Sequence, residues 1–334
     1  MTKQRRIFLI AFIAVITIIF IGCTIIALEI SSQAFGRVEE YSDNEFWPVY
    51  RWKDIDQSKY PREEVHFYSA GNKLQGFIYG ASNTNGLVVI SEGLGGTADD
   101  YLSLIMYFVD KYWCVFAINN TGVSGSEGDS VRGMTQSVID LDAALTYVKN
   151  TSMFNDMPIM LVGHSWGGYA VCSILNYNHK INAVVSFAGY NKGSDVIEQF
   201  GVLAVGRIYH ILSPLMLAIE KQVFGDTANL TAIDGINKSN IPIMIVQCSN
   251  DDVIRANTIS IYAHRKEITN PYVEIIYRDG EYATGHNYPY FSKEQKVYMD
   301  SINTNDETKI NKVLANELDP ELMERINIMF NNAR

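Results

Sequence analysis

The sequence predicts an α/β fold in which a mostly parallel, eight-stranded sheet carries helices on both faces. Short apolar runs recur between residues 65 and 276, and stretches with helical spacing, such as Val138–Val148, separate several of them. Strands that alternate with helices indicate a parallel sheet, because each helix returns the chain to the same end of the sheet. The predicted strands are Val65–Tyr68, Leu74–Tyr79, Leu87–Ser91, Cys114–Asn119, Pro158–Val162, Ala183–Ala188, Ile243–Gln247 and Tyr272–Ile276. The first two form an antiparallel pair.

The composition describes a globular protein and excludes some partners. The chain has 334 residues, 47% of them hydrophobic, enough for one large domain or two ordinary ones. Its net charge of −10 argues against nucleic acid, because phosphate binding needs a basic surface. The cysteines are scattered in apolar runs, so we interpret them as core residues: Cys23, Cys114, Cys172 and Cys248. No cysteine–histidine cluster indicates a metal site, and we expect no metal or organic cofactor.

The N-terminal segment predicts a membrane anchor. Residues 7–28 carry no charge, and a helix of this length spans about 33 Å, against about 30 Å for the apolar core of a bilayer. A cleaved signal peptide is the main alternative, although its apolar region is usually shorter. Phe20–Cys23 also loosely matches a lipoprotein cleavage box. Because Lys3, Arg5 and Arg6 precede the segment, we expect a single-pass protein of the cell membrane with an extracytoplasmic catalytic domain.

The rest of the chain divides into a linker and one domain. The predicted segments are a cytoplasmic end (1–6), an anchor (7–28), a stalk or linker (29–59) and an α/β domain (60–334). The regular alternation breaks at 190–240, where a long and largely apolar insertion replaces a short connection. Such insertions commonly lie over the strand ends and select the substrate, so we expect a small helical cap.

One stretch, Pro158–Cys172, is the strongest candidate for a reactive centre. A buried strand runs directly into Gly163-His-Ser165-Trp-Gly167, and a helical pattern follows at once. A serine in such a turn takes a strained backbone conformation, and the glycines let strand and helix approach closely. Its hydroxyl then projects beside free amides of the helix N-terminus, as attack on a carbonyl requires. We therefore predict that Ser165 is a nucleophile.

A serine nucleophile needs a general base. Of the six histidines, His286 lies in a loop after the last predicted strand, at the sheet edge where sites form in open α/β folds. His164 adjoins Ser165 on the chain, but we expect its side chain to point the other way. The sequence therefore favours His286 as the base.

The base needs an acid that fixes its tautomer. Asp251 and Asp252 follow the strand Ile243–Gln247, again at the carboxyl edge of the sheet. An aspartate there also suits the N-cap of a following helix, which the pattern predicts over 256–269. We favour Asp251 as the acid and interpret Asp252 as the cap.

An oxyanion hole needs two amide donors. The amide of Trp166, directly after the nucleophile, supplies one. The glycine-rich loop Ser91–Gly96 follows a predicted strand, and its glycines let the backbone approach a bound carbonyl. We assign Leu94 as the second donor, with Gly93 as the nearest alternative.

These motifs give the chain a family resemblance. From about residue 60 to 303 it resembles the α/β-hydrolase superfamily, most closely the serine aminopeptidase-like and monoacylglycerol lipase-like branch. The resemblance rests on Gly163–Gly168, Ser249–Ile254 and Gly285–Asn287, in the superfamily's order of nucleophile, acid and base. Asn119–Gly128 looks like a glycine-rich turn of that branch, although the sequence differs at several of its positions. Glu92 stands where the branch usually has histidine.

The resemblance implies the α/β-hydrolase fold and a Ser–His–Asp hydrolase with a helical cap. Together with the residues, it predicts a membrane-anchored serine hydrolase of an ester, thioester or amide, and the apolar cap favours a hydrophobic substrate. A serine exopeptidase of the same fold is an alternative. It would need a carboxylate near Ser165 to hold a free amine, and Glu92 is the candidate. A non-catalytic surface binding protein is the other alternative.

Overall fold

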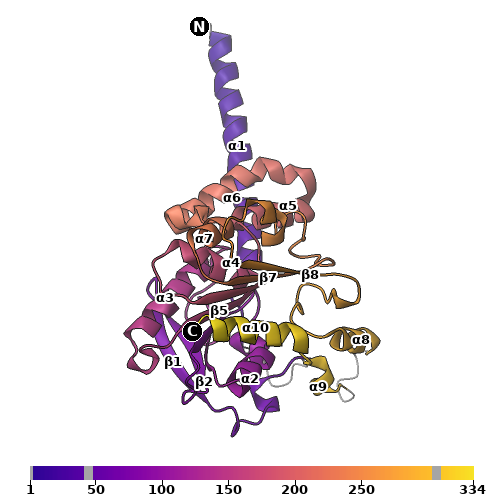
Figure 1. Cartoon of the computed structure of the whole chain (residues 1–334). Helices are drawn as coiled ribbons and strands as arrows, with labels where there is room; N and C mark the ends of the chain where they lie inside the picture. Colours follow the sequence, from indigo (N-terminus) through magenta and orange to yellow (C-terminus); the bar gives the residue numbers. More distant parts are fainter. Residues whose placement is uncertain (1–2, 41–47, 303–309) are drawn as a thin grey trace.

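One sheet runs through the body of the molecule and sets the position of everything else (Figure 1). The computed structural model describes residues 3–40, 48–302 and 310–334. Its strands are β1 (Arg62–Ser69), β2 (Asn72–Tyr79), β3 (Leu87–Ser91), β4 (Cys114–Ile118), β5 (Ile159–His164), β6 (Ala183–Phe187), β7 (Ile243–Cys248) and β8 (Val273–Arg278). Their order in the sheet is β1-β2-β4-β3-β5-β6-β7-β8.

The sheet is antiparallel at one edge and parallel elsewhere. β2 pairs antiparallel with β1 and with β4, while every other neighbouring pair is parallel. The predicted strands and the predicted opening hairpin are thereby confirmed. The turn of that hairpin passes through Ala70 and Gly71, whose φ angles of 47° and 92° are positive.

Helices cover both faces of the sheet because the buried strands are apolar on both sides. Val89 in β3 faces the core cluster shared with α3 (Gln136–Asn150), α4 (Trp166–Ser173) and α7 (Ala232–Lys238). Its neighbour Val88 faces the opposite cluster. The helices of that second layer are α2 (Leu102–Asp110) and α10 (Pro320–Asn332). Two short helices, α8 (Lys293–Ser301) and α9 (Lys312–Ala315), precede α10.

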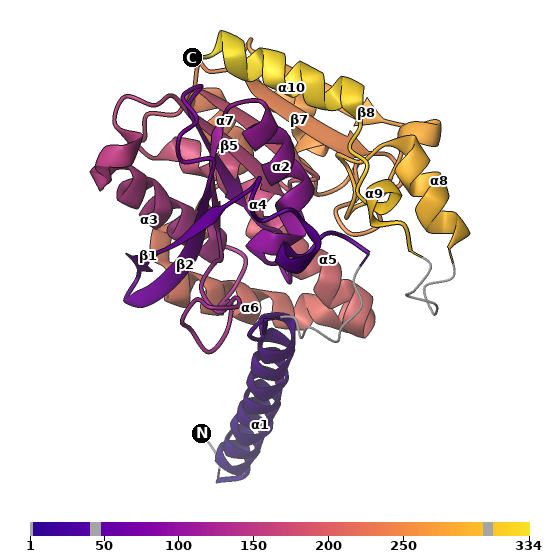
Figure 2. The same cartoon turned by 90° about the horizontal axis from the view of Figure 1, so that it is seen from below.

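The insertion at 190–240 supplies the cap and one helix of the main domain. Helices α5 (Gly193–Val205) and α6 (Tyr209–Phe224) lie together beyond the sheet, on the side from which the N-terminal helix projects (Figures 1 and 2). In contrast, α7 packs on α4 so closely that a Cβ at Gly235 would lie 2.1 Å from the Cys172 carbonyl oxygen. The predicted cap therefore consists of α5 and α6, and α7 belongs to the layer beside the sheet.

A long helix, α1 (Lys3–Ala34), projects from the cap side of the domain (Figure 2). It contains the segment 7–28 that the sequence predicts as a membrane anchor. Within the described residues, no helix has the combination of length and apolarity that spanning a membrane requires.

The chain that follows α1 is held on the domain. The Phe35 carbonyl accepts a hydrogen bond from the Val131 amide at 3.0 Å, and the Val38 amide donates to the Gly122 carbonyl at 2.8 Å. Arg37 donates to the carbonyl oxygens of Ser126 and Gly128, each at 2.9 Å. The predicted stalk, 29–59, thus begins inside α1 and contacts the domain within a few residues; its residues 41–47 lie outside the described part of the chain.

Three of the four cysteines are buried and unpaired, as predicted for core residues: Cys114, Cys172 and Cys248. The side chain of Cys23 lies outside the described part of the structure.

Candidate active site

Ser165 occupies the sharp turn between β5 and α4. Its φ angle is +53°, a left-handed value that confirms the predicted strain. Close packing at the turn explains both flanking glycines, because Gly163 lies against α4 and Gly167 lies against the end of β3. A Cβ at Gly163 would lie 2.2 Å from the Gly167 carbonyl oxygen, and one at Gly167 would lie 2.1 Å from the Ser91 carbonyl oxygen. No larger residue fits either position unless the backbone moves.

The structure brings the three predicted side chains into one hydrogen-bonded series. The Ser165 hydroxyl lies 2.9 Å from His286 Nε2, and His286 Nδ1 lies 2.9 Å from Asp251 Oδ2. All three side chains are buried. With Nδ1–H directed at the carboxylate, Nε2 carries a lone pair toward the hydroxyl, as a general base requires.

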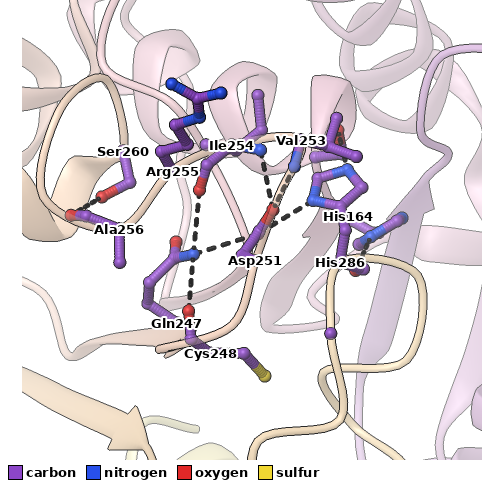
Figure 3. A network of polar contacts seen from close by, with 12 residues as sticks. His164, Gln247, Cys248, Asp251, Val253, Ile254, Arg255, Ala256, Ser260 and His286 are labelled. Carbon is purple, nitrogen blue, oxygen red and sulfur yellow. Dashed lines mark hydrogen bonds and ion pairs between the residues drawn. The ribbon is translucent and has the colours of Figure 1, made fainter.

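Asp251 is fixed by four hydrogen bonds (Figure 3). Its Oδ1 accepts from the amides of Val253 and Ile254 at 3.0 and 2.7 Å. Its Oδ2 accepts from His286 and from Gln247 Nε2, the latter at 3.0 Å. Gln247 was not found from the sequence; the available signal is an amide side chain inside the buried strand β7.

The interpretation of Asp252 as a cap is wrong. Asp252 is exposed, and it is Asp251 that accepts from the backbone amides beyond it. The predicted helix over 256–269 is also wrong, because the regular structure there is a short 3-10 helix, Ile261–Glu267. One carboxylate therefore both organises the loop and orients the His286 side chain.

The loop after β3 and the start of α4 supply the candidate oxyanion hole. Leu94, Ser165 and Trp166 line the same cavity. Trp166 is the first residue of α4, so its amide has no acceptor within the helix. The Gly93 amide already donates to the Tyr101 hydroxyl at 2.7 Å. Of the two alternatives in this loop, Leu94 is consequently the better donor to a bound oxyanion.

The cavity at Ser165 has a volume of about 800 Å³ and mostly apolar walls. One wall comes from the cap, with Phe200 and Ala204 on α5 and Met216 on α6. The N-terminal segment also lines the cavity, with Ala34 at the end of α1 and with Phe35. The sequence does not predict this contribution. The N-terminal segment therefore forms part of the cavity wall as well as an extension of the domain.

Glu92 is not among the residues that line the cavity. Its side chain is fully buried, and its Oε1 accepts from the Asn120 amide at 2.6 Å. Burial, reinforced by the charge of Asp140, raises the pKa of Glu92 to about 8. A fully buried carboxyl that does not line the cavity is unable to bind the free amine of a peptide.

The cavity wall contains an acidic side chain. Asp100 is the one carboxylate among the described residues that line the cavity. It is buried and forms an ion pair with Arg51 at 3.0 Å. Its charge is therefore already compensated within the protein. Nor do the described residues contain a group of three or more side chains suited to hold a metal ion.

Comparisons with known proteins agree with this architecture. Residues 82–219 match a family model described as serine aminopeptidase, S33. The esterase Pf2001 of Pyrococcus furiosus is 15% identical, with a TM-score of 0.59 over 85% of this chain and 97% of that one. Est1E of Butyrivibrio proteoclasticus, solved with ferulic acid bound, is 15% identical, with a TM-score of 0.51 over 67% of this chain and 91% of that one.

A third structure has the same fold. The α/β hydrolase GrgF of Penicillium sp. sh18 is 17% identical, with a TM-score of 0.52 over 68% of this chain and 91% of that one. A search of the curated proteins finds no match to this sequence. The sheet, the serine turn and these likenesses define the α/β-hydrolase fold. Residues 82–219, the part that matches the serine aminopeptidase family model, are less than half of the chain and include Ser165.

The two aspartates predict opposite mutational effects. Asp251→Asn places an amide beside His286 Nδ1 and favours the wrong tautomer, so we expect turnover to fall roughly 10³- to 10⁴-fold. Asp252→Asn changes an exposed side chain, and we expect turnover within about twofold of wild type and stability within about 0.5 kcal/mol. Hydrolysis of a nitrophenyl ester and urea unfolding of both variants check this. A large loss of turnover in Asp252→Asn alone would reverse the assignment.

Glu92 predicts a pH-dependent stability. Its folded pKa of about 8 lies above the ordinary value of 4.5, so the folded state binds more protons than the unfolded state between these limits. The free energy of unfolding therefore falls as pH rises through this range. Glu92→Gln removes this dependence on pH. At pH 9 we expect the free energy of unfolding of the variant to exceed that of wild type by more than about 1.4 kcal/mol, the equivalent of one pKa unit.

The difference between the two proteins should shrink toward pH 5, where the protonated carboxyl resembles the amide. Urea unfolding at several pH values measures it, with Glu63→Gln as the control because Glu63 is an exposed carboxylate of β1. Equal pH profiles for wild type and Glu92→Gln would contradict the prediction.

Proposed function

We propose that this protein hydrolyses an ester of a hydrophobic acyl group through an acyl-enzyme on Ser165, with thioesters and amides as related substrates. The observation that carries the proposal is the hydrogen-bonded series Ser165–His286–Asp251, which faces a largely apolar cavity. Apolar walls favour an acyl chain over a charged peptide end, because burying a charge without a partner is costly.

The first half of the reaction forms the acyl-enzyme. His286 Nε2 removes the proton of the Ser165 hydroxyl as its oxygen attacks the carbonyl carbon. The oxyanion accepts hydrogen bonds from the amides of Leu94 and Trp166, and Asp251 stabilises the imidazolium. His286 then returns the proton to the leaving alcohol oxygen as the carbon–oxygen bond breaks.

The second half releases the acid. A water molecule attacks the acyl carbon and gives its proton to His286 Nε2. The second tetrahedral intermediate collapses, the Ser165 oxygen takes that proton back, and a carboxylic acid leaves. Every step uses side chains and amides of this chain.

A fluorophosphonate probe tests the chemistry. We expect the probe to label wild type and not Ser165→Ala, because the serine oxygen is the attacking atom. A folded but unlabelled wild type would instead favour the non-catalytic binding protein.

The substrate class is tested with nitrophenyl esters of increasing acyl length and with aminoacyl nitroanilides. We expect kcat/KM to rise about fourfold per methylene until the cavity is filled, since each buried methylene contributes ~0.8 kcal/mol. A preference for aminoacyl nitroanilides would identify an exopeptidase and overturn the ester proposal.

We also propose that α1 attaches the enzyme to the cell membrane and that the catalytic domain is extracytoplasmic. The support is the exposed apolar surface along α1, which includes Ile7, Phe8 and Ile18, and the basic residues Arg5 and Arg6 before it. Apolar surface of this extent is otherwise unfavourable in water.

Fractionation of cells tests the attachment. We expect the full chain to sediment with membranes, and a form that lacks residues 2–30 to stay in solution while it still hydrolyses esters. Protease added to intact cells should degrade the catalytic domain if it is extracytoplasmic. Recovery of the full chain in the soluble fraction would contradict the attachment.

A further inference from the structure

His164, the residue before the nucleophile, connects the two halves of the active site. Its side chain is buried, and the sequence-based expectation that it points away from the site is wrong. His164 Nδ1 lies 2.9 Å from the Tyr101 hydroxyl, and His164 Nε2 lies 2.9 Å from the main-chain carbonyl oxygen of His286. The rings of His164 and His286 are 5.1 Å apart between centroids.

The groups at the two ends of this series determine which atom carries each hydrogen. A carbonyl oxygen only accepts, so His164 Nε2 carries the hydrogen that the His286 carbonyl receives. His164 Nδ1 is then an acceptor, and the Tyr101 hydroxyl donates to it. The Tyr101 oxygen in turn accepts from the Gly93 amide at 2.7 Å. The series therefore has one direction, from Gly93 through Tyr101 and His164 to His286.

Each end of the series belongs to a part of the catalytic machinery. Gly93 precedes Leu94 in the oxyanion loop, so the bond to Tyr101 fixes the orientation of that loop's backbone. The His286 carbonyl belongs to the base, so the bond from His164 fixes the main chain that carries the imidazole. A Cβ at Gly93 would lie 2.9 Å from His164 Nδ1, which shows how closely the loop rests on the series.

The series keeps its protons while the reaction runs. Burial, together with the charge on a protonated His286, lowers the pKa of His164 to about 3. Burial also raises the pKa of Tyr101, which remains a hydroxyl. Formation of the His286 imidazolium therefore leaves all three hydrogen bonds in place.

We propose that Tyr101 and His164 are positioning residues that hold the oxyanion loop and the general base at fixed distances from Ser165. The proposal rests on the proposed function, because it assigns these residues a role in the same hydrolysis. It differs from a purely structural role in its consequence: loss of the series should weaken binding of the transition state more than binding of the substrate.

Tyr101→Phe tests the proposal with the loss of one oxygen atom. The change leaves the Gly93 amide and His164 Nδ1 without partners but keeps the aromatic ring. We expect kcat to fall roughly 10- to 100-fold with KM within about twofold, because small displacements of the hole are enough for such a loss. The affinity for an alkylboronic acid, which forms a tetrahedral adduct on Ser165, should fall by the same factor.

Tyr290→Phe is the matched control. Tyr290 is buried in the same aromatic cluster, with ring centroids 6.5 Å from Tyr101 and 6.2 Å from His164. Its hydroxyl is not one of the groups that form the series, so we expect kcat within about twofold of wild type. An equal loss in both variants, or a loss in Tyr101→Phe carried entirely by KM, would overturn the proposal.

His164 gives a second test that does not depend on Tyr101. Glutamine retains an N–H donor for the His286 carbonyl, and leucine retains none, so we expect the order of kcat to be wild type, then His164→Gln, then His164→Leu. Equal activity in all three, in protein that the fluorophosphonate probe still labels, would overturn the proposal and leave the proposed function intact. A wild type that the probe fails to label would overturn the proposed function itself.

Discussion

The close packing of β5 against α4 at Ser165 is the constraint on which the site depends. The contact of β5 with α4 admits only glycine at Gly163, and the contact of α4 with the end of β3 admits only glycine at Gly167. The serine between them takes a left-handed backbone conformation. That conformation is unfavourable by itself and persists because the buried sheet around it permits no alternative. The strain aims the hydroxyl at His286 and aligns the first amide of α4 beside it. The same packing brings Ser91, and the loop that follows it, against the turn.

Much of the fold was predictable because its signals are local. The apolar strands and the helix α3 have a clear period, and the serine turn carries its own glycines. The predicted nucleophile, base and acid lie together because all three follow strands of one parallel sheet, whose carboxyl ends share an edge. The antiparallel opening pair was predictable from its short glycine turn. Local sequence patterns, together with the strand order of a parallel sheet, are enough to predict these features.

The remaining features depend on contacts between segments that are distant in the sequence. His164 joins the site because Tyr101 and the His286 carbonyl approach it from two other loops, and strand alternation alone gives no hint of either. Gln247 supports Asp251 through a turn whose shape the sequence did not reveal. The helical composition of the segment after Asp252 favours a cap at that residue, whereas in the structure Asp251 accepts from the backbone amides there. The sequence leaves Glu92 as a candidate for amine binding, because its burial depends on contacts with distant segments such as Asn120.

The contribution of Ala34 and Phe35 to the cavity has a practical consequence. Proteins with an apolar N-terminal segment are commonly prepared for biochemistry without it, on the assumption that the segment is independent of the active site. Here a truncation placed after residue 35 would remove one wall of the cavity together with the helix. Rate constants and inhibitor affinities from such a preparation would describe a wider and wetter pocket than the native one. The N-terminal boundary of a recombinant form is thus a choice about substrate specificity as well as solubility.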